Sequence, residues 1–217
     1  ETDRDLGDMM ESFVEALDAD DDRTRQYAAR TIRYTIKTNP DALTSDISKL
    51  ADFVNEDTKK VQWHATAALR ELADTRPTVV KDAAVHELMM QLRDGGYRKT
   101  QRHAASALGR VAREHPDAAT VALPYLTERF NDDYPPARSS AAFAVSHVAE
   151  EFPEELVRRN DIWDVISLLT DDHQYSKRYA SRILGRVAKE FPDEVEPAIP
   201  LLVELLTDDY YMMRASA

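Results

Sequence analysis

The sequence of 217 residues contains no cysteine, only five glycines and only eight lysines. The lack of cysteine excludes disulfide bonds and thiolate metal sites. Glycine-rich loops that bind phosphates or dinucleotides are missing, as are the G-x-S-x-G and H-E-x-x-H motifs of hydrolases and zinc proteases. Charged residues interrupt every long apolar stretch, and none reaches the roughly 20 residues that a membrane span needs. We therefore predict a protein that is not an enzyme and that does not contact a membrane.

Acidic residues dominate the charge, with 40 Asp and Glu against 28 Lys and Arg and a net charge of −12. This balance excludes a uniformly basic nucleic-acid binder. The Asp-rich, Lys-poor composition is typical of cytoplasmic proteins of salt-loving organisms, and an ordinary acidic cytosolic protein is equally compatible with it. No signal peptide opens the chain, so we predict a cytoplasmic protein. The first residue is not Met and the last falls inside a repeat, which predicts a piece of a longer chain.

Two columns of residues recur along the chain with the same alternating step. Prolines follow one another after 37, 39, 37 and 39 residues, at Pro40, Pro77, Pro116, Pro153 and Pro192. A second, mostly basic column keeps these steps at Arg25, Gln62, Gln101, Arg138, Lys177 and Arg214. Periods of this length are typical of stacked helical repeats.

Each repeat divides into two helical patterns joined by an acidic turn. The first has apolar residues at helical spacing, such as Ile47, Leu50 and Val54. The acidic turn, such as Asp132-Asp133, can cap the N–H groups of the helix that follows. The second helix presents small residues to its neighbours, at Ala28, Ala65, Ala104, Ala141 and Ala180. Larger residues fill the core one turn later, at Ile32, Leu69, Leu108, Val145 and Leu184.

The best-preserved copies read Q-R-H-A-A-S-A-L-G-R-V-A-R-E-H-P-D at 101–117 and K-R-Y-A-S-R-I-L-G-R-V-A-K-E-F-P-D at 177–193. This pattern resembles the HEAT repeat, particularly the HEAT-like type of phycobilin lyases and prokaryotic scaffolds. The resemblance implies an all-α fold, a right-handed α-solenoid (alpha-alpha superhelix) of stacked antiparallel helix pairs whose second helices line the concave side. It predicts one domain, 1–217, with five full repeats and a partial sixth, at approximately 9–44, 45–82, 83–120, 121–159, 160–197 and 198–217.

The charge is sorted between the two kinds of helix. Thirteen residues of each second helix, counted from the basic column, together carry +11, so the rest of the chain carries −23. Arginines and aromatic residues occupy the outward positions, and such a surface suits an anionic partner with planar groups. We therefore predict a scaffold that binds an acidic peptide or protein surface in its concave groove, without cofactor or metal. The predicted groove residues are Arg30, Arg33, Tyr34, Trp63, Arg70, Arg102, Arg110, Phe143, Arg178, Tyr179, Arg182 and Arg186.

Other interpretations of these residues stay open. Basic side chains also favour solvated faces, and Trp63 and Phe143 could equally pack beneath a neighbouring helix. The same concave face could bind nucleic acid, as in HEAT-like alkylpurine DNA glycosylases, whose Trp and Asp near the lesion would correspond to Trp63 and Asp74. Six to ten phosphate contacts lose about 10³–10⁵ in affinity between 50 and 200 mM salt, so a salt-rich cytoplasm would count against this alternative.

Two further sets of residues have a predicted structural role. His64 and His103 occupy equivalent positions of adjacent repeats, about 10 Å apart by helix packing distance, too far to share a zinc ion. The basic column would pair with acidic residues of the turns and form a ladder along the repeats. Its predicted members are Arg25, Arg138, Lys177 and Arg214. Exposed pairs of this kind contribute roughly 0–1 kcal/mol each.

Overall fold

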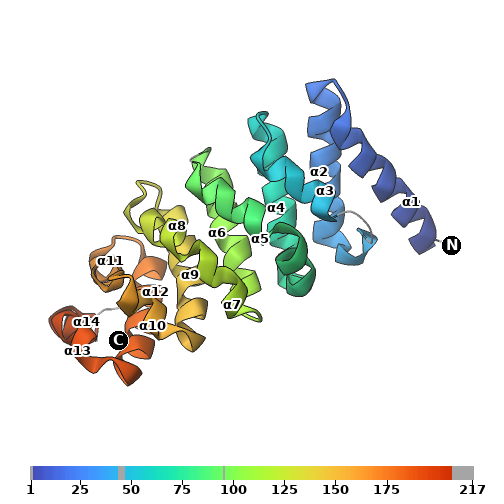
Figure 1. Ribbon diagram of the computed structural model, residues 1–217. Coiled ribbons are helices and arrows are strands. Elements are labelled where there is room, and N and C mark those ends of the chain that lie inside the picture. Colours follow the sequence, from blue (N-terminus) through green and yellow to red (C-terminus); the bar gives the residue numbers. More distant parts are fainter. Residues whose placement is uncertain (1, 44–46, 95, 207–217) are drawn as a thin grey trace. The chain divides into compact units, whose positions relative to one another are not determined.

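The computed structural model describes residues 2–43, 47–94 and 96–206, and every regular element in these ranges is helical (Figure 1). The chain divides into two compact units, Glu1–His115 and Pro116–Ala217, which we call unit 1 and unit 2. The position of Arg214, predicted as the last member of the basic column, lies outside the described residues. The all-α prediction is thereby confirmed for the described part of the chain.

Unit 1 alternates long helices with shorter helical segments. The second helices of its repeats are α2 (Asp22–Thr38), α4 (Lys59–Thr75) and α6 (Arg98–Ala112). The remaining elements are α1 (Thr2–Glu15), η1 (Ala16–Asp18), η2 (Pro40–Ala42), α3 (Ile47–Asp52), η3 (Phe53–Asn55) and α5 (Pro77–Arg93), where η marks a 3₁₀ helix.

Unit 2 follows the same plan with two second helices, α9 (Pro135–Glu151) and α12 (Gln174–Glu190). Its other α-helices are α7 (Pro116–Ala119), α8 (Leu123–Glu128), α10 (Pro153–Arg158), α11 (Ile162–Ser167), α13 (Pro192–Val195) and α14 (Ile199–Leu205). Its 3₁₀ helices are η4 (Thr120–Ala122), η5 (Arg129–Asn131), η6 (Leu168–Thr170) and η7 (Glu196–Ala198).

The helix boundaries keep the period of the sequence. The five second helices begin 37, 39, 37 and 39 residues apart, the same steps as the proline column. Each proline of the column is the first residue of the helix or 3₁₀ turn that follows. Proline lacks a backbone N–H and disfavours the α conformation of the residue before it, so it ends one helix and is tolerated at the start of the next.

Small residues let the second helices pack closely. In unit 1, α4 packs against both α2 and α6, and in unit 2, α9 packs against α12, as Figure 1 also shows. The five alanines of the column are at most 3% exposed, and the five larger residues one turn later are completely buried. The predicted core positions of the second helices are therefore confirmed.

The first segments differ from the single helix that the apolar spacing predicts. In unit 1, α5 runs unbroken for 17 residues because no proline or glycine lies inside it. The equivalent stretch of unit 2 is split into α7, η4, α8 and η5, and Pro124 stands in the first turn of α8. Between α10 and α11, Asn160 adopts a left-handed conformation (φ 61°), which ends the first of these helices.

Carboxylates of the acidic turns bind the N–H groups at helix starts, as predicted. Asp21 accepts hydrogen bonds from the Thr24 N–H and hydroxyl, both at 2.8 Å, and so caps α2. Asp132 accepts from the Tyr134 N–H and Asp171 from the His173 N–H, each at 2.7 Å. The turns therefore fix where these second helices begin.

Two rungs of the predicted ladder are present. Arg25 pairs with Asp22 of its own turn and, at 3.2 Å, with Glu56 of the next turn. Arg138 donates two hydrogen bonds to Asp171 of the next turn, from Nη2 to Oδ1 at 2.7 Å and from Nε to Oδ2 at 2.5 Å. Among the described residues, Lys177 forms no such pair. The ladder is thus confirmed at Arg25 and Arg138 only.

The Arg138–Asp171 pair should stabilise unit 2 more than an exposed pair would. The side chain of Asp171 is 4% exposed and that of Arg138 is 17% exposed. Burial raises the pKa of the Asp171 carboxyl, but the bonds from Arg138 and the His173 N–H outweigh it and leave this pKa lowered. Arg138→Ala would leave a buried carboxylate without its cation, so the free energy of unfolding should fall by about 2–4 kcal/mol. Urea unfolding followed by circular dichroism measures this loss.

The matched control is Arg25→Ala, because its partners Asp22 and Glu56 are 68% and 23% exposed, against 4% for Asp171. This change should cost at most about 1 kcal/mol. Equal losses for the two variants would contradict the role assigned to the buried pair.

Candidate functional site

The predicted groove residues fall into two groups, one in each unit. Seven of them lie on the second helices of unit 1, which we call the unit-1 cluster: Arg30, Arg33, Tyr34, Trp63, Arg70, Arg102 and Arg110. Five lie on those of unit 2, the unit-2 cluster: Phe143, Arg178, Tyr179, Arg182 and Arg186. Because α4 packs between α2 and α6, the outward strips of these three helices lie next to one another.

Trp63 is the centre of the unit-1 cluster. Its indole is half-buried, and the guanidinium carbon of Arg33, on α2, lies 4.5 Å from the ring centroid. The ring of His103, on α6, lies 5.8 Å away on a tilted plane, and that of His64 lies 4.6 Å away, edge to face. Trp63 is therefore neither sealed in the core nor fully solvated, and it joins side chains of all three second helices.

Tyr34 extends the aromatic surface along α2. The guanidinium carbons of Arg30 and Arg33 lie 5.7 and 5.5 Å from its ring centroid, within the range of cation–π contacts. Tyr34 is 50% exposed and Arg30 is exposed as well. This end of the cluster is open to a partner.

The unit-1 cluster holds more cations than anions. Arg70 pairs with Glu71, and the Arg110 Nε lies 2.8 Å from Asp74 Oδ1. The other three arginines, Arg30, Arg33 and Arg102, have no ion pair with a carboxylate among the described residues. Positive charge is therefore in surplus at this surface.

Burial and this surplus of positive charge lower the pKa of two histidines. Burial, followed by the positive charges of Arg33 and Arg30, lowers the pKa of His64 to about 4. Burial and the charges of Arg70, Arg102, Arg33 and Arg110 lower the pKa of His103 to about 3. Both rings are neutral at pH 7, so they contact Trp63 as polar, uncharged groups.

The unit-2 cluster is built around an aromatic contact between α9 and α12. The Phe143 ring lies 5.5 Å from that of Tyr179 and 4.9 Å from that of His147, which it meets edge to face. The guanidinium carbon of Arg178 lies 6.0 Å from the Tyr179 ring centroid. Phe143 is half-buried, so, like Trp63, it contacts a neighbouring helix and keeps part of its surface exposed.

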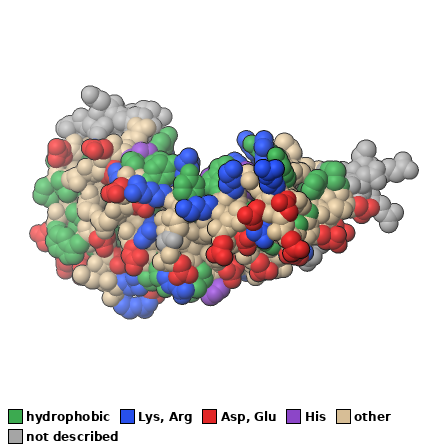
Figure 2. Space-filling view, turned by 90° about the horizontal axis from the view of Figure 1, so that it is seen from above, with side chains coloured by type: hydrophobic (Ala, Val, Ile, Leu, Met, Phe, Trp, Pro, Cys, Tyr) green, Lys and Arg blue, Asp and Glu red, His purple; other side chains and the backbone are tan. Residues whose placement is uncertain are grey.

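A carboxylate neutralises part of the unit-2 cluster. Glu150, on α9, pairs with Arg182 and lies 3.8 Å from Arg186, both on α12. The two clusters therefore differ in their ion pairs, because three arginines of the unit-1 cluster have no carboxylate partner among the described residues. In Figure 2, Lys and Arg side chains of the N-terminal unit gather along one edge, and Asp and Glu spread over the surface below it.

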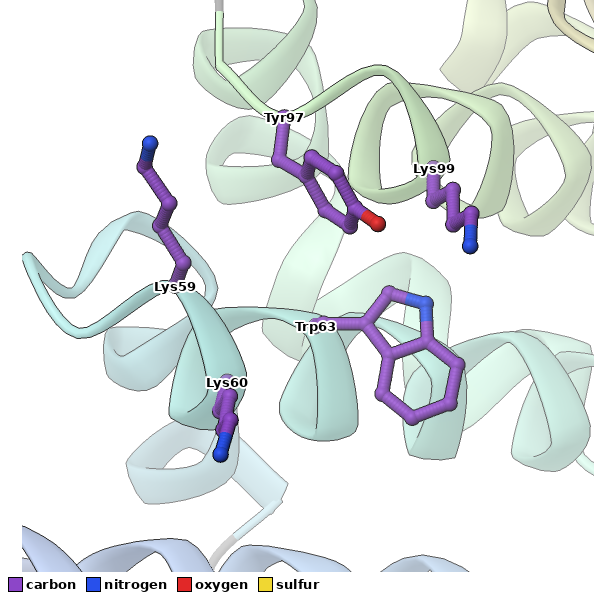
Figure 3. Close-up of a pocket in the computed structure, with 5 residues that line it drawn as sticks. All are labelled: Lys59, Lys60, Trp63, Tyr97 and Lys99. Atoms are coloured by element: carbon purple, nitrogen blue, oxygen red, sulfur yellow. The ribbon is translucent and has the colours of Figure 1, made fainter.

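A pocket of about 310 Å³ opens beside Trp63 (Figure 3). Its other lining residues are Lys59, Lys60, Tyr97 and Lys99. None of these four was predicted, although Lys59 and Lys60 precede Trp63 by one helical turn and so share its side of α4. The sequence did contain a signal for the lysines. Three of the eight lysines of the chain lie close to Trp63 or at the equivalent position of the next repeat.

Metal-ion sites and membrane spans are not found in the part of the chain that the structure describes. Within residues 2–43, 47–94 and 96–206, no three His, Asp or Glu side chains gather in a way that could hold a metal ion. The helices of the same ranges include none with the length and apolar character that crossing a bilayer requires.

Comparison with known proteins agrees with the repeat pattern. Residues 98–148 match a family model described as a HEAT-like repeat, which confirms the resemblance inferred from the sequence. Searching the curated proteins produced no match.

Solved structures of an engineered protein and of designed armadillo repeat proteins share the fold. An engineered protein from a structural genomics consortium is 28% identical, with a TM-score of 0.82 over 95% of this chain and 94% of its own. A computationally designed armadillo repeat protein for modular peptide recognition is 18% identical, with a TM-score of 0.83 over 94% and 95%. A designed armadillo repeat protein in complex with the peptide (KR)4 is also 18% identical, with a TM-score of 0.80 over 94% and 95%.

The lowered pKa values of His64 and His103 make stability depend on pH. Each pKa in the folded state lies below the unfolded value of 6.5, so the unfolded chain takes up protons first as the pH falls. The contribution to stability is complete above pH 6.5 and is lost as the pH falls toward 4 and 3. Between pH 7 and pH 5.5, each histidine should cost about 1 kcal/mol of unfolding free energy.

Denaturant unfolding at the two pH values, compared between the natural chain and the His64→Gln, His103→Gln double variant, tests this dependence. The double variant should lose about 2 kcal/mol less than the natural chain over this interval. His86→Gln is the control, because His86 is exposed on α5. An unchanged pH dependence in the double variant would refute the assignment.

Proposed function

We propose that this chain, a stack of HEAT-like repeats, is a non-enzymatic scaffold that binds an acidic peptide or an acidic protein surface. Each unit would contribute a binding surface of its own, the unit-1 cluster on one and the unit-2 cluster on the other. The observation that carries the proposal is the surplus of arginine around Trp63, where Arg30, Arg33 and Arg102 have no carboxylate partner among the described residues. Such side chains can form ion pairs with a partner without first breaking internal ones.

The geometry of the unit-1 cluster favours an extended or irregular partner segment. Aromatic and cationic groups alternate from Tyr34 and Arg33 on α2 to Trp63 on α4, and α6 adds Arg102 to the same cluster. Arginine pairs with carboxylates through a planar fork of donors, and Trp and Tyr provide contact area at a small cost in side-chain entropy. Alternating charge and ring therefore suits a peptide in which acidic and apolar side chains alternate.

The fold supports a role in peptide binding, and the charge indicates the kind of peptide. One similar designed protein is described in complex with (KR)4, a peptide of lysine and arginine. In the present chain the candidate surface is itself basic, so the complementary peptide would be rich in Asp and Glu. The peptide (KR)4 therefore becomes a negative control for the proposal.

Charge reversal at the open end of the unit-1 cluster tests the proposal. A fluorescently labelled peptide in which acidic and apolar residues alternate should bind the natural chain in an anisotropy titration, and labelled (KR)4 should not. Arg30→Glu with Arg33→Glu should weaken binding of the acidic peptide at least about tenfold, since two cationic contacts become repulsive. Helical circular dichroism should be unchanged, because Arg30 is exposed and Arg33 is half-exposed.

The matched control reverses Lys49 and Lys81, which lie on α3 and α5 and pair with Asp18 and Asp82. It changes the net charge of the chain by the same amount as the first double variant. Binding should remain within about twofold of the natural chain. An equal loss in both variants would mean that net charge alone attracts the peptide, and the proposed surface would be wrong.

Nucleic acid is the second candidate partner, because an indole under an arginine, as at Trp63 and Arg33, can also stack on a base. Asp74, the acidic residue of the glycosylase comparison, lies in an ion pair with Arg110. An electrophoretic mobility shift assay at about 150 mM salt should give no stable complex with duplex DNA, because contacts to phosphates weaken steeply with salt. A tight complex under these conditions would place nucleic acid ahead of acidic peptides.

A further inference from the structure

The pocket beside Trp63 combines an aromatic wall with a cationic rim. Figure 3 shows Tyr97 and Lys99 reaching from the start of α6 toward the Trp63 indole, while Lys59 and Lys60 extend from the first turn of α4. Tyr97 is 41% exposed, and the Lys99 ammonium lies 5.8 Å from its ring centroid. The Trp63 ring and the Tyr97 ring thus supply flat surfaces, and the three lysines supply charge around them.

The lysines of this pocket occupy first turns of helices, where positive charge is disfavoured. The first turns of α4 and α6 contain no acidic residue and begin with Lys59-Lys60 and Arg98-Lys99. A cation at a helix N-terminus is disfavoured by the helix dipole. By contrast, α2 begins with Asp22 behind the Asp21 cap. Positions that break a local rule without an evident structural gain are where function is expected.

The same lysines have no carboxylate partner within the described residues, whereas Lys49 and Lys81 each pair with an aspartate. Anionic groups brought by a partner would therefore meet cations that have no carboxylate partner among the described residues.

We propose that this pocket binds an aromatic side chain of the acidic partner, with carboxylates that flank this side chain pairing with Lys59, Lys60 and Lys99. The volume of about 310 Å³ lies at the lower end of the range for ligand sites, roughly 300–1,000 Å³, and so suits a single ring. The ring packs against Trp63 and Tyr97, and the lysine rim selects acidic neighbours over basic ones. This inference rests on the proposed binding of an acidic peptide and specifies its anchor residue.

A single tryptophan can report on this pocket. The chain has two tryptophans, and Trp163, on α11 of unit 2, is 59% exposed and is not one of the residues that line the pocket. Trp163→Phe leaves Trp63 as the only source of indole emission. The probes are two peptides of glutamates, one with a central phenylalanine and the other with a central alanine.

The phenylalanine peptide should bind about tenfold more tightly than the alanine peptide and should change the emission of Trp63. Tyr97→Ala and Lys99→Ala should each reduce this preference, whereas Tyr97→Phe, which keeps the ring, should retain it. Lys81→Ala is the control for the charge removed with Lys99, and it should leave the preference unchanged. All these substitutions affect exposed or half-exposed side chains, so the variants are expected to fold.

The outcomes separate the two proposals. Equal affinity for the two peptides would overturn the pocket while leaving the acidic-peptide surface intact. A preference for phenylalanine that survives Tyr97→Ala and Lys99→Ala would also overturn it, because the ring would then bind elsewhere. Failure of both peptides to bind would overturn the proposed function and the pocket together.

Discussion

The close approach of neighbouring second helices is the constraint on which the rest of the structure depends. Alanines such as Ala65 and Ala104 allow the backbones of α4 and α6 to pack without large intervening side chains. A helix flanked on both sides in this way leaves one narrow strip for its polar and aromatic residues. Side chains on adjacent strips are therefore crowded together, whatever their charge.

Crowding explains why the unit-1 cluster has an unusual electrostatic character. Like charges at adjacent strips repel, and this repulsion, added to burial, keeps His64 and His103 neutral and lowers the pKa of Arg70. Surplus positive charge of this kind costs stability in the unbound chain. An anionic partner would remove part of that cost on binding, so the arrangement that is unfavourable for folding is favourable for recognition.

The two clusters share residue types but differ in what a partner must displace. In unit 2, Glu150 already engages Arg182 and lies close to Arg186. A carboxylate of a partner must compete with this internal one, which reduces its net gain. In unit 1, the contacts of Arg30 and Arg33 within the described part of the chain are with the rings of Tyr34 and Trp63, and neither arginine has a carboxylate partner there. Of the two surfaces, unit 1 is thus better prepared to bind an anion.

The architecture was predictable because its determinants are periodic. Proline at Pro77 or Pro153 defines a helix boundary by covalent geometry alone, and buried alanines at a fixed step define a helix contact. The splitting of the first segments was not predicted, since it depends on single residues such as Pro124 and on the left-handed Asn160 rather than on the repeat.

The candidate site was predictable only in part. An outward position follows from helical periodicity, which placed Arg33 and Trp63 on the same surface. Helical periodicity does not predict which side chains form ion pairs, because the contact between Glu150 and Arg182 depends on side-chain conformations on two helices. Tyr97 and Lys99 could not be predicted from the repeat, because they lie ahead of the basic column, at the N-cap and in the first turn of α6, where the repeat pattern assigns a turn.

The net charge of −12 decides what kind of interaction the binding surface can use. At long range, an acidic partner is repelled by the chain as a whole, and this repulsion is screened beyond about 10 Å at 0.1 M salt. At short range, half-buried arginines beside Trp63 are screened much less. Electrostatic attraction to the arginines therefore acts only once the partner already lies against the surface. Shape and aromatic contacts must determine which partner binds, and ion pairs then stabilise the complex. An aromatic pocket rimmed by lysine meets both requirements in one place.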